Sequence, residues 1–176
     1  MSPEISVIIP TYNRASMVVE AVESVLAQDV TDFELIVIND GSTDETEKRL
    51  SAYGSRLKQY QQENAGVSAA RNCGVTFSTA PLITFLDSDD LWLPSKLRVQ
   101  HTYMTENPEI YICQTEEIWW RNGRRVNPKK HHQKPSGDVF QRSLELCLVS
   151  PSAVMMRREL FEKVGYFDEE LPMAED

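Results

Sequence analysis

The sequence predicts an α/β fold in which a mostly parallel central sheet carries helices on both faces. Short apolar runs alternate along the chain with segments whose apolar residues are spaced as on one face of a helix. Such alternation is typical of a parallel sheet wound by right-handed crossovers. With 176 residues and 41% hydrophobic content, the chain is long enough to fold as one domain with its own core.

The first two strand–helix units show the clearest patterns. Ile5–Ile9 is an almost unbroken apolar run, as expected of a strand buried on both faces. The next segment predicts a helix with one apolar stripe, formed by Met17, Val18, Ala21, Val22, Val25 and Leu26. Phe33–Ile38 predicts a second strand. Ser42 and Glu45 fit a capping box, which predicts a helix reaching about Leu50.

The next units are less regular. Leu57–Gln61 predicts a weaker third strand. Residues 66–77 predict a helix of small residues, three of which have the i, i+4 spacing that allows close approach to the sheet: Gly66, Ala70 and Gly74. Leu82–Leu86 predicts a fourth strand, and Pro94 with Ser95 favours a helix start just downstream.

The fourth apolar run ends in Asp87-Ser88-Asp89-Asp90, which places three carboxylates within four residues. Open α/β sheets bind their ligands at the carboxyl ends of the strands. Two unit charges about 4 Å apart interact by roughly 4 kcal/mol at an intermediate dielectric, so these acids repel one another unless a cation joins them. The cluster predicts half of a metal site, completed by a ligand. Taken alone, it also fits a turn or helix cap.

Polar groups follow three of the predicted strands: Thr11 and Tyr12, then Asp40, then the Asp87 cluster. In a parallel sheet these loops lie at the same edge. The seven glycines form neither a dinucleotide-binding G-x-G-x-x-G nor a phosphate-binding P-loop. A nucleotide here would therefore be bound through its base or ribose, with its diphosphate bridged by a metal.

Four segments, in this order and spacing, resemble the family 2 nucleotide-sugar glycosyltransferases: Ser6–Asn13 (SVIIPTYN), Asn39–Asp44 (NDGSTD), Asn64–Asn72 (NAGVSAARN) and Leu86–Asp90 (LDSDD). Val149–Ala153 and Val164–Glu169 also fit the later half of that family. The resemblance implies a Rossmann-like, A-type nucleotide-diphospho-sugar transferase fold. It also implies one catalytic domain over 1–176, with a nucleotide-binding half at 1–90 and a partial, truncated acceptor-side half at 91–176.

The activity that the resemblance implies is inverting transfer of a sugar, most simply from a UDP-sugar, to a hydroxyl acceptor in glycan or polysaccharide synthesis, with Mn²⁺ or Mg²⁺. Carried onto this sequence, the base would contact Pro10, Thr11 and the ring of Tyr12, while Asp40 would accept the imide N–H of uracil. The remaining donor contacts would come from Arg71 at the base or diphosphate, from Asp87 with Ser88 at the ribose, and from Asp89 as the metal ligand.

The same resemblance assigns the catalytic base to Asp176 of the Glu175-Asp176 pair. Asp176 is the last residue, whereas the family continues into a helix that holds this carboxylate. A misplaced base loses much of the rate. Donor binding is therefore expected to survive better than transfer.

Composition and charge limit the kinds of binding partner that the protein is expected to have. The net charge of −9 argues against general nucleic-acid binding. The basic residues between Arg121 and Lys134 leave open a contact with a diphosphate or a lipid headgroup, and hence peripheral membrane association. The acceptor would be a carbohydrate or a lipid-linked glycan, and a homodimer also stays open. Three widely spaced cysteines, no signal peptide and no membrane-length apolar run predict a cytoplasmic protein, with the inner face of the membrane as one location.

Two features of the second half have competing interpretations. Asn122-Gly123 predicts a hairpin turn after Trp119 and Trp120, and strand alternation would turn one ring inward for packing and the other outward, where it could line a sugar site. His131-His132 lie in a basic loop that either closes over a diphosphate or is simply solvated. Their spacing does not fit a helical zinc pair.

Two other functions remain as alternatives. One is a nucleotide-binding fragment without catalysis. The other is a phosphatase of the haloacid dehalogenase type with Asp87 as nucleophile. The second is disfavoured because Leu91 stands where such enzymes have Thr or Val, and because two strand–helix units precede the motif.

Overall fold

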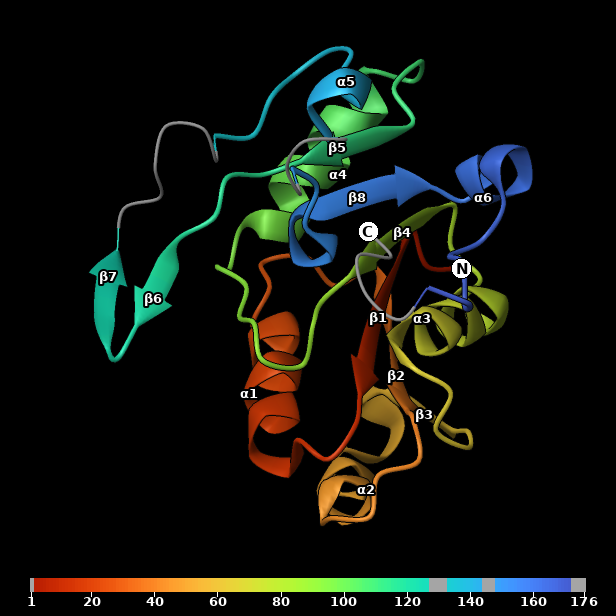
Figure 1. The fold of residues 1–176 in the computed structure, drawn as a ribbon, viewed down its shortest axis with the longest axis vertical. Helices are drawn as coiled ribbons and strands as arrows, with labels where there is room; N and C mark the ends of the chain where they lie inside the picture. Colours follow the sequence, from red (N-terminus) through yellow and green to blue (C-terminus); the bar gives the residue numbers. More distant parts are fainter. Residues whose placement is uncertain (1, 127–132, 144–147, 172–176) are drawn as a thin grey trace.

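The computed structural model describes residues 2–126, 133–143 and 148–171, and it contains a central sheet of six strands (Figure 1). In spatial order these are β3 (Lys58–Gln61), β2 (Phe33–Asn39), β1 (Ile5–Thr11), β4 (Leu82–Phe85), β8 (Val154–Arg157) and β5 (Ile112–Gln114). The first four are parallel to one another, and β8 runs antiparallel to both of its neighbours. The expected mostly parallel sheet is confirmed.

Helices cover both faces of this sheet, as predicted. The helices of the described ranges are α1 (Ala15–Leu26), α2 (Thr46–Ser51), α3 (Val67–Phe77), α4 (Lys96–Glu106), α5 (Phe140–Ser143) and α6 (Glu159–Val164). All of them except α5, which has no buried residue, contribute side chains to the cores on the two faces of the sheet. No helix in these parts of the chain is long and apolar enough to cross a membrane. Two short 3₁₀ helices, Gly54–Arg56 and Pro151–Ala153, complete the helical elements of the described ranges.

The alternation of side chains along β1 explains why there are two cores. Val7 and Ile9 pack with α1, α2 and α4 on one face, whereas Ile8 packs with α3 and α6 on the other. Gly74 allows α3 to approach the sheet, because a Cβ there would lie 2.3 Å from Ile8 Cγ2. A Cβ at Gly66 would meet no atom within 4 Å, so the prediction that this residue allows α3 to approach the sheet closely is wrong. Its φ of 94° at the start of α3 is what favours glycine.

The capping box predicted at Ser42 and Glu45 is wrong. The Ser42 hydroxyl accepts a hydrogen bond from the backbone N–H of Asn13 instead, and α2 begins four residues later, at Thr46. The N-cap residue is Glu45, which makes no side-chain cap bond, and the Asp44 carboxylate accepts from the N–H of the first helical residue, Thr46, across 2.9 Å. The Ser42 hydroxyl, which the local pattern assigned to the helix, therefore bonds to a backbone N–H that is distant in the sequence.

The predicted hairpin is present as β6 (Trp119–Arg121) and β7 (Arg124–Val126), with φ of 51° at Asn122 and 70° at Gly123. The expectation of one inward and one outward ring is wrong, because Trp119 is 37% and Trp120 68% exposed. Figure 1 shows that the two strands project away from the central sheet, and neither strand contributes to the two cores formed by the described residues.

Candidate active site

The loops after β1 and β2 are joined into one rigid segment at the carboxyl edge of the sheet. Asn13 adopts a left-handed conformation, with φ of 52°. Its side-chain oxygen accepts from the N–H groups of Thr43 (2.8 Å) and Asp44 (3.3 Å). The Asp44 carboxylate in turn accepts from the N–H of Ala15 across 3.1 Å. These contacts fix how the chain enters α1, and with it the side chains of Tyr12 and Arg14.

Within the first loop, only one of the predicted base-contacting residues offers a surface to a ligand. The Tyr12 side chain is exposed, with 47% of the residue accessible, and a base could lie against its ring. Pro10 and Thr11 are buried. The Thr11 hydroxyl has no hydrogen-bond partner among the described residues, so it remains available to a group that reaches the end of β1.

Asp40, at the end of β2, holds the loop between β3 and α3. It is 4% exposed, and its carboxylate accepts four hydrogen bonds. Oδ1 accepts from the Gln62 amide (2.7 Å) and the Ala65 N–H (3.0 Å). Oδ2 accepts from the Asn64 amide (3.1 Å) and the Gly66 N–H (2.9 Å). Sequence reasoning missed this structural role, and the contact of Asp40 with a base stays a prediction.

Arg71, on α3, forms an ion pair with Asp87. Its Nη2 donates to Asp87 Oδ1 across 2.9 Å; the arginine side chain is 3% exposed and the aspartate side chain 30%. The guanidinium also lies 5.6 Å from the centre of the Phe167 ring. A buried cation needs such a partner. Arg71 therefore positions Asp87, while its predicted approach to a base or diphosphate remains untested.

The acidic loop after β4 rests on the 3₁₀ turn that precedes β8. The Asp87 N–H donates to Ser152 Oγ (3.0 Å), and the Trp92 indole donates to the Ser152 carbonyl (2.8 Å). Ser88 is buried, with 4% of the residue exposed. Ser152 was noticed in the sequence only as part of a motif, because the contact joins positions 65 residues apart.

The carboxylates of this loop suit a divalent cation. Asp89 is about half exposed, and its Oδ2 lies 2.5 Å from Arg14 Nη1. Burial raises the pKa of Asp90, and the neighbouring carboxylates Asp87, Asp89 and Glu117 raise it further, although a hydrogen bond from Ser152 lowers it. Such crowding of negative charge is what a bound cation relieves.

Oxygen ligands of this kind are those that Mn²⁺ or Mg²⁺ prefers. In the described ranges, no group of three or more His, Cys, Asp or Glu side chains is placed to hold a metal by itself. The loop therefore fits a metal whose coordination is completed by a ligand such as a diphosphate.

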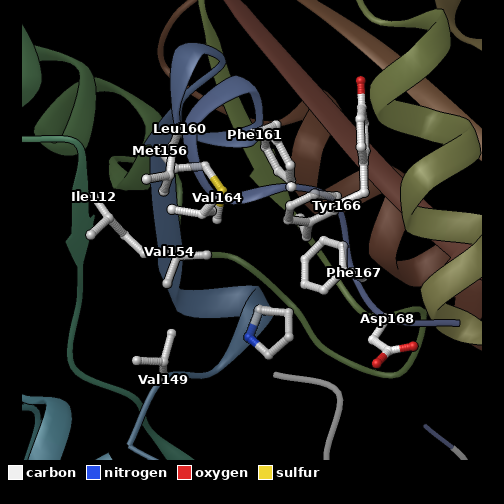
Figure 2. Close-up of a pocket in the computed structure, with 13 residues that line it drawn as sticks. Ile112, Val149, Val154, Met156, Leu160, Phe161, Val164, Tyr166, Phe167 and Asp168 are labelled. Atoms are coloured by element: carbon white, nitrogen blue, oxygen red, sulfur yellow. The ribbon is translucent and has the colours of Figure 1, made fainter. Parts of the chain in front are cut away.

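An apolar pocket of about 300 Å³ lies on the α3 and α6 face of the sheet (Figure 2). Its walls include Val154 and Met156 of β8 and Phe161 and Val164 of α6, and Asp168 is at its edge. The segment that follows α6 is tied to α3, because Asn72 donates to the Phe167 carbonyl and accepts from the Phe167 N–H. The pocket and the Arg71–Asp87 pair thus share Phe167 as a wall.

Asp176, the predicted base, lies outside the described residues, as do Glu175, His131 and His132. The structure brings the remaining predicted site residues to the carboxyl edge of β1, β2 and β4 or to the start of α3. Comparison with known proteins shows the family of the chain. The profile of glycosyl transferase family 2 matches residues 6–165. The chain belongs to this family.

Curated relatives agree with the assignment to glycosyl transferase family 2. An uncharacterised glycosyltransferase of Rickettsia felis is 35% identical over 98% of this chain and 29% of its own length. The Escherichia coli protein WfgD, named as a UDP-Glc:α-D-GlcNAc-diphosphoundecaprenol β-1,3-glucosyltransferase, is 31% identical over 92% of this chain and 63% of its own. The chain spans 25% to 57% of the length of the five Rickettsia proteins that it matches.

A solved structure confirms the A-type glycosyltransferase fold. Staphylococcus aureus TarS 1–349, in complex with UDP-GlcNAc, matches with a TM-score of 0.82 at 28% identity, over 98% of this chain and 51% of that one. The prediction of a family 2 glycosyltransferase domain is confirmed at the level of the family. The haloacid dehalogenase alternative is set aside, because that enzyme type belongs to a different family.

Proposed function

We propose that this family 2 domain binds a UDP-sugar and transfers the sugar, with inversion, to a hydroxyl group of a glycan or lipid-linked glycan, in a reaction that depends on Mn²⁺ or Mg²⁺. The observation that carries the proposal is the convergence of Tyr12, Asp40 and the Asp87–Asp90 loop at one edge of the sheet. The similarity to TarS, which was solved with UDP and with UDP-GlcNAc, supports a uridine donor.

The nucleotide would lie between the loop after β1 and the start of α3. The Tyr12 ring offers a stacking surface for the base. An imide N–H would approach Asp40 Oδ1, where it would share or replace the amide of Gln62. Asp87, oriented by Arg71 and Ser152, would accept from the ribose hydroxyls through its exposed oxygen.

Asp89 is the residue that we assign to the metal. Its side chain is 47% exposed, against 30% for Asp87, so it is the more accessible of the two to an ion from solvent. A metal held there supplies Lewis-acid stabilisation of the charge on the leaving nucleoside diphosphate. Asp90 lies near the same carboxylates, and its pKa is raised first by burial and then by these neighbours. A cation bound nearby would lower the pKa of Asp90 again.

The chain's own part in the transfer step is proton removal. As the acceptor oxygen bonds to the anomeric carbon and the bond to the diphosphate breaks, the acceptor's proton passes to a carboxylate, for which we propose Asp176. The diphosphoundecaprenol-linked acceptor in the name of WfgD supports a lipid-linked glycan acceptor. We propose polysaccharide synthesis at the cytoplasmic face of a membrane as the setting of the reaction.

Two substitutions test these assignments. UDP binding and the release of UDP from UDP-Glc and UDP-GlcNAc would be measured with Mn²⁺ present. Asp89→Asn is expected to lose metal-dependent UDP binding, and Asp176→Asn to keep UDP affinity while losing turnover. Unchanged Mn²⁺-dependent affinity in Asp89→Asn would remove Asp89 from the site. Full turnover in Asp176→Asn would mean that another residue is the base.

A further inference from the structure

Arg14 and Asp89 form an ion pair that joins the start of α1 to the acidic loop after β4. Arg14 Nη1 lies 2.5 Å from Asp89 Oδ2, and the two side chains are 43% and 47% exposed. The contact belongs to the edge of the sheet where the donor is expected. It places a positive group beside the carboxylate that the proposed function assigns to the metal.

The backbone around Arg14 explains why its side chain points toward this loop. The preceding residue, Asn13, is held in its left-handed conformation by Ser42, Thr43 and Asp44. Arg14 itself is the N-cap residue of α1, and its carbonyl accepts from the N–H of Val18. The arginine therefore extends from a turn whose backbone is held by hydrogen bonds, and its planar guanidinium loses less entropy per hydrogen bond formed than a lysine ammonium would.

We propose that Arg14 is an exchangeable internal cation of the donor site. Its guanidinium neutralises Asp89 in the free protein, leaves when a metal takes that carboxylate, and then pairs with the phosphate oxygens of the donor. This inference rests on the proposed function, because it requires Asp89 to be the metal ligand. Guanidinium groups bind phosphate with the same forked geometry with which they bind carboxylates, so both partners suit Arg14.

The exchange couples the metal and the donor. A metal must displace Arg14 before it can use Asp89 fully, so the ion pair weakens binding of the metal alone. Donor phosphates hold the released arginine away from Asp89, so the donor strengthens metal binding. By thermodynamic linkage, the metal strengthens donor binding by the same factor. Arg14 thereby favours a state in which both ligands are bound over a state with the metal alone.

The test measures Mn²⁺ binding from the electron paramagnetic resonance signal of the free ion, first without nucleotide. Half-exposed ion pairs of this kind are worth up to about 1 kcal/mol, so Arg14→Ala is expected to bind Mn²⁺ about fivefold more tightly than the unaltered chain. The difference should shrink at about 1 M salt, which screens the pair. With Mn²⁺ saturating, Arg14→Ala should bind UDP about tenfold more weakly, because a charged hydrogen bond to phosphate is lost.

Arg49→Ala is the matched control. Arg49 is a half-exposed arginine on α2 that pairs with Glu45, so its removal changes the net charge by the same amount without touching Asp89. An equal tightening of Mn²⁺ binding in Arg49→Ala would overturn the proposal, since net charge alone would then explain the effect. So would equal Mn²⁺ affinities in the unaltered chain and in Arg14→Ala, if Asp89→Asn loses the metal. Unchanged Mn²⁺ binding in Asp89→Asn would instead reject the metal assignment on which the inference rests.

Discussion

Arg71 and Asp87 share one hydrogen-bonded ion pair in which the guanidinium is almost fully buried and the carboxylate reaches the surface. The burial is asymmetric because Arg71 extends from α3 beneath the loop, with the Phe167 ring on one side. The packing of α3 and of the segment after α6 therefore fixes the position of Arg71, and Arg71 in turn orients the Asp87 carboxylate at the edge of the sheet. The proposed ribose contact, Asp87, is thus oriented by residues of two other elements of the fold.

Removing this arginine should damage both stability and binding. Arg71→Ala takes away the ion pair and the contact with Phe167, so we expect a loss of about 2 kcal/mol in the free energy of unfolding. UDP affinity should fall at least about tenfold, because Asp87 is no longer fixed. Urea denaturation and calorimetry measure the two effects. Arg98→Ala removes an exposed pair with Asp29 and should change stability by less than about 0.5 kcal/mol.

The hydrogen bonds of Asp40 predict that its carboxylate keeps residues 62–66 ordered. In Asp40→Asn, one side-chain oxygen becomes an NH₂ group that faces donors, so at least one of the donors from residues 62–66 loses its acceptor. We expect a loss of about 2 kcal/mol and faster amide hydrogen exchange at Ala65 and Gly66. Unchanged exchange at these two amides would show that the carboxylate does not hold the loop in solution.

Glu34 predicts how stability falls in acid. Burial alone would raise the pKa of Glu34, but hydrogen bonds from Lys58, Ser6 and Thr79 outweigh it and lower the pKa to about 2 from 4.5. The ionised form is therefore favoured in the folded state. Its contribution, about 2 kcal/mol after allowance for solvent screening, is complete above pH 4.5 and is lost as the pH falls from there toward 2. Glu34→Gln should be less stable than the unaltered chain at pH 7 and equally stable near pH 2.

Lys96 predicts that stability also changes with pH in the alkaline range, here because of burial and not because of hydrogen bonds. Its ammonium lies 4.0 Å from the centre of the Trp92 ring and donates to the Gln100 side chain. Burial lowers the pKa of Lys96 to about 7 from 10.5. Between these values the unfolded chain binds a proton that the folded chain lacks, so stability attributable to Lys96 rises with pH.

Lys96→Met removes this titration. Its stability advantage over the unaltered chain should be largest, about 1–3 kcal/mol, below pH 7, and should shrink as the pH approaches 10.5. Chemical denaturation across this pH range measures the difference. A difference that stays constant with pH would mean that the lysine is solvated and titrates normally.

The sequence predicted the strands and helices of residues 1–90 because burial on both faces leaves a direct trace. Ile5–Ile9 and Phe33–Ile38 are each apolar except for one residue, Ser6 and Glu34, and both became strands of the central sheet. The positions of the polar loops followed from the same parallel order. These features depend on neighbouring residues, so a pattern along the chain is enough to recognise them.

Features that depend on distant partners could not be predicted in this way. Asp40 has the same local surroundings whether it faces a ligand or accepts bonds from residues 22 to 26 positions away. The pairing of Arg14 with Asp89 joins two loops separated by most of residues 1–90. The antiparallel direction of β8 is likewise set by its partners, since a strand of four residues carries no signal of its direction.

Calorimetric titration of the chain with UDP, with and without Mn²⁺ and with ADP and GDP as controls, tests the central claim most directly. We predict that UDP binds, that Mn²⁺ strengthens its binding, and that ADP and GDP bind much more weakly. Absence of UDP binding under both conditions, or equal affinity for all three nucleotides, would contradict the assignment of this edge of the sheet as a uridine-dependent donor site.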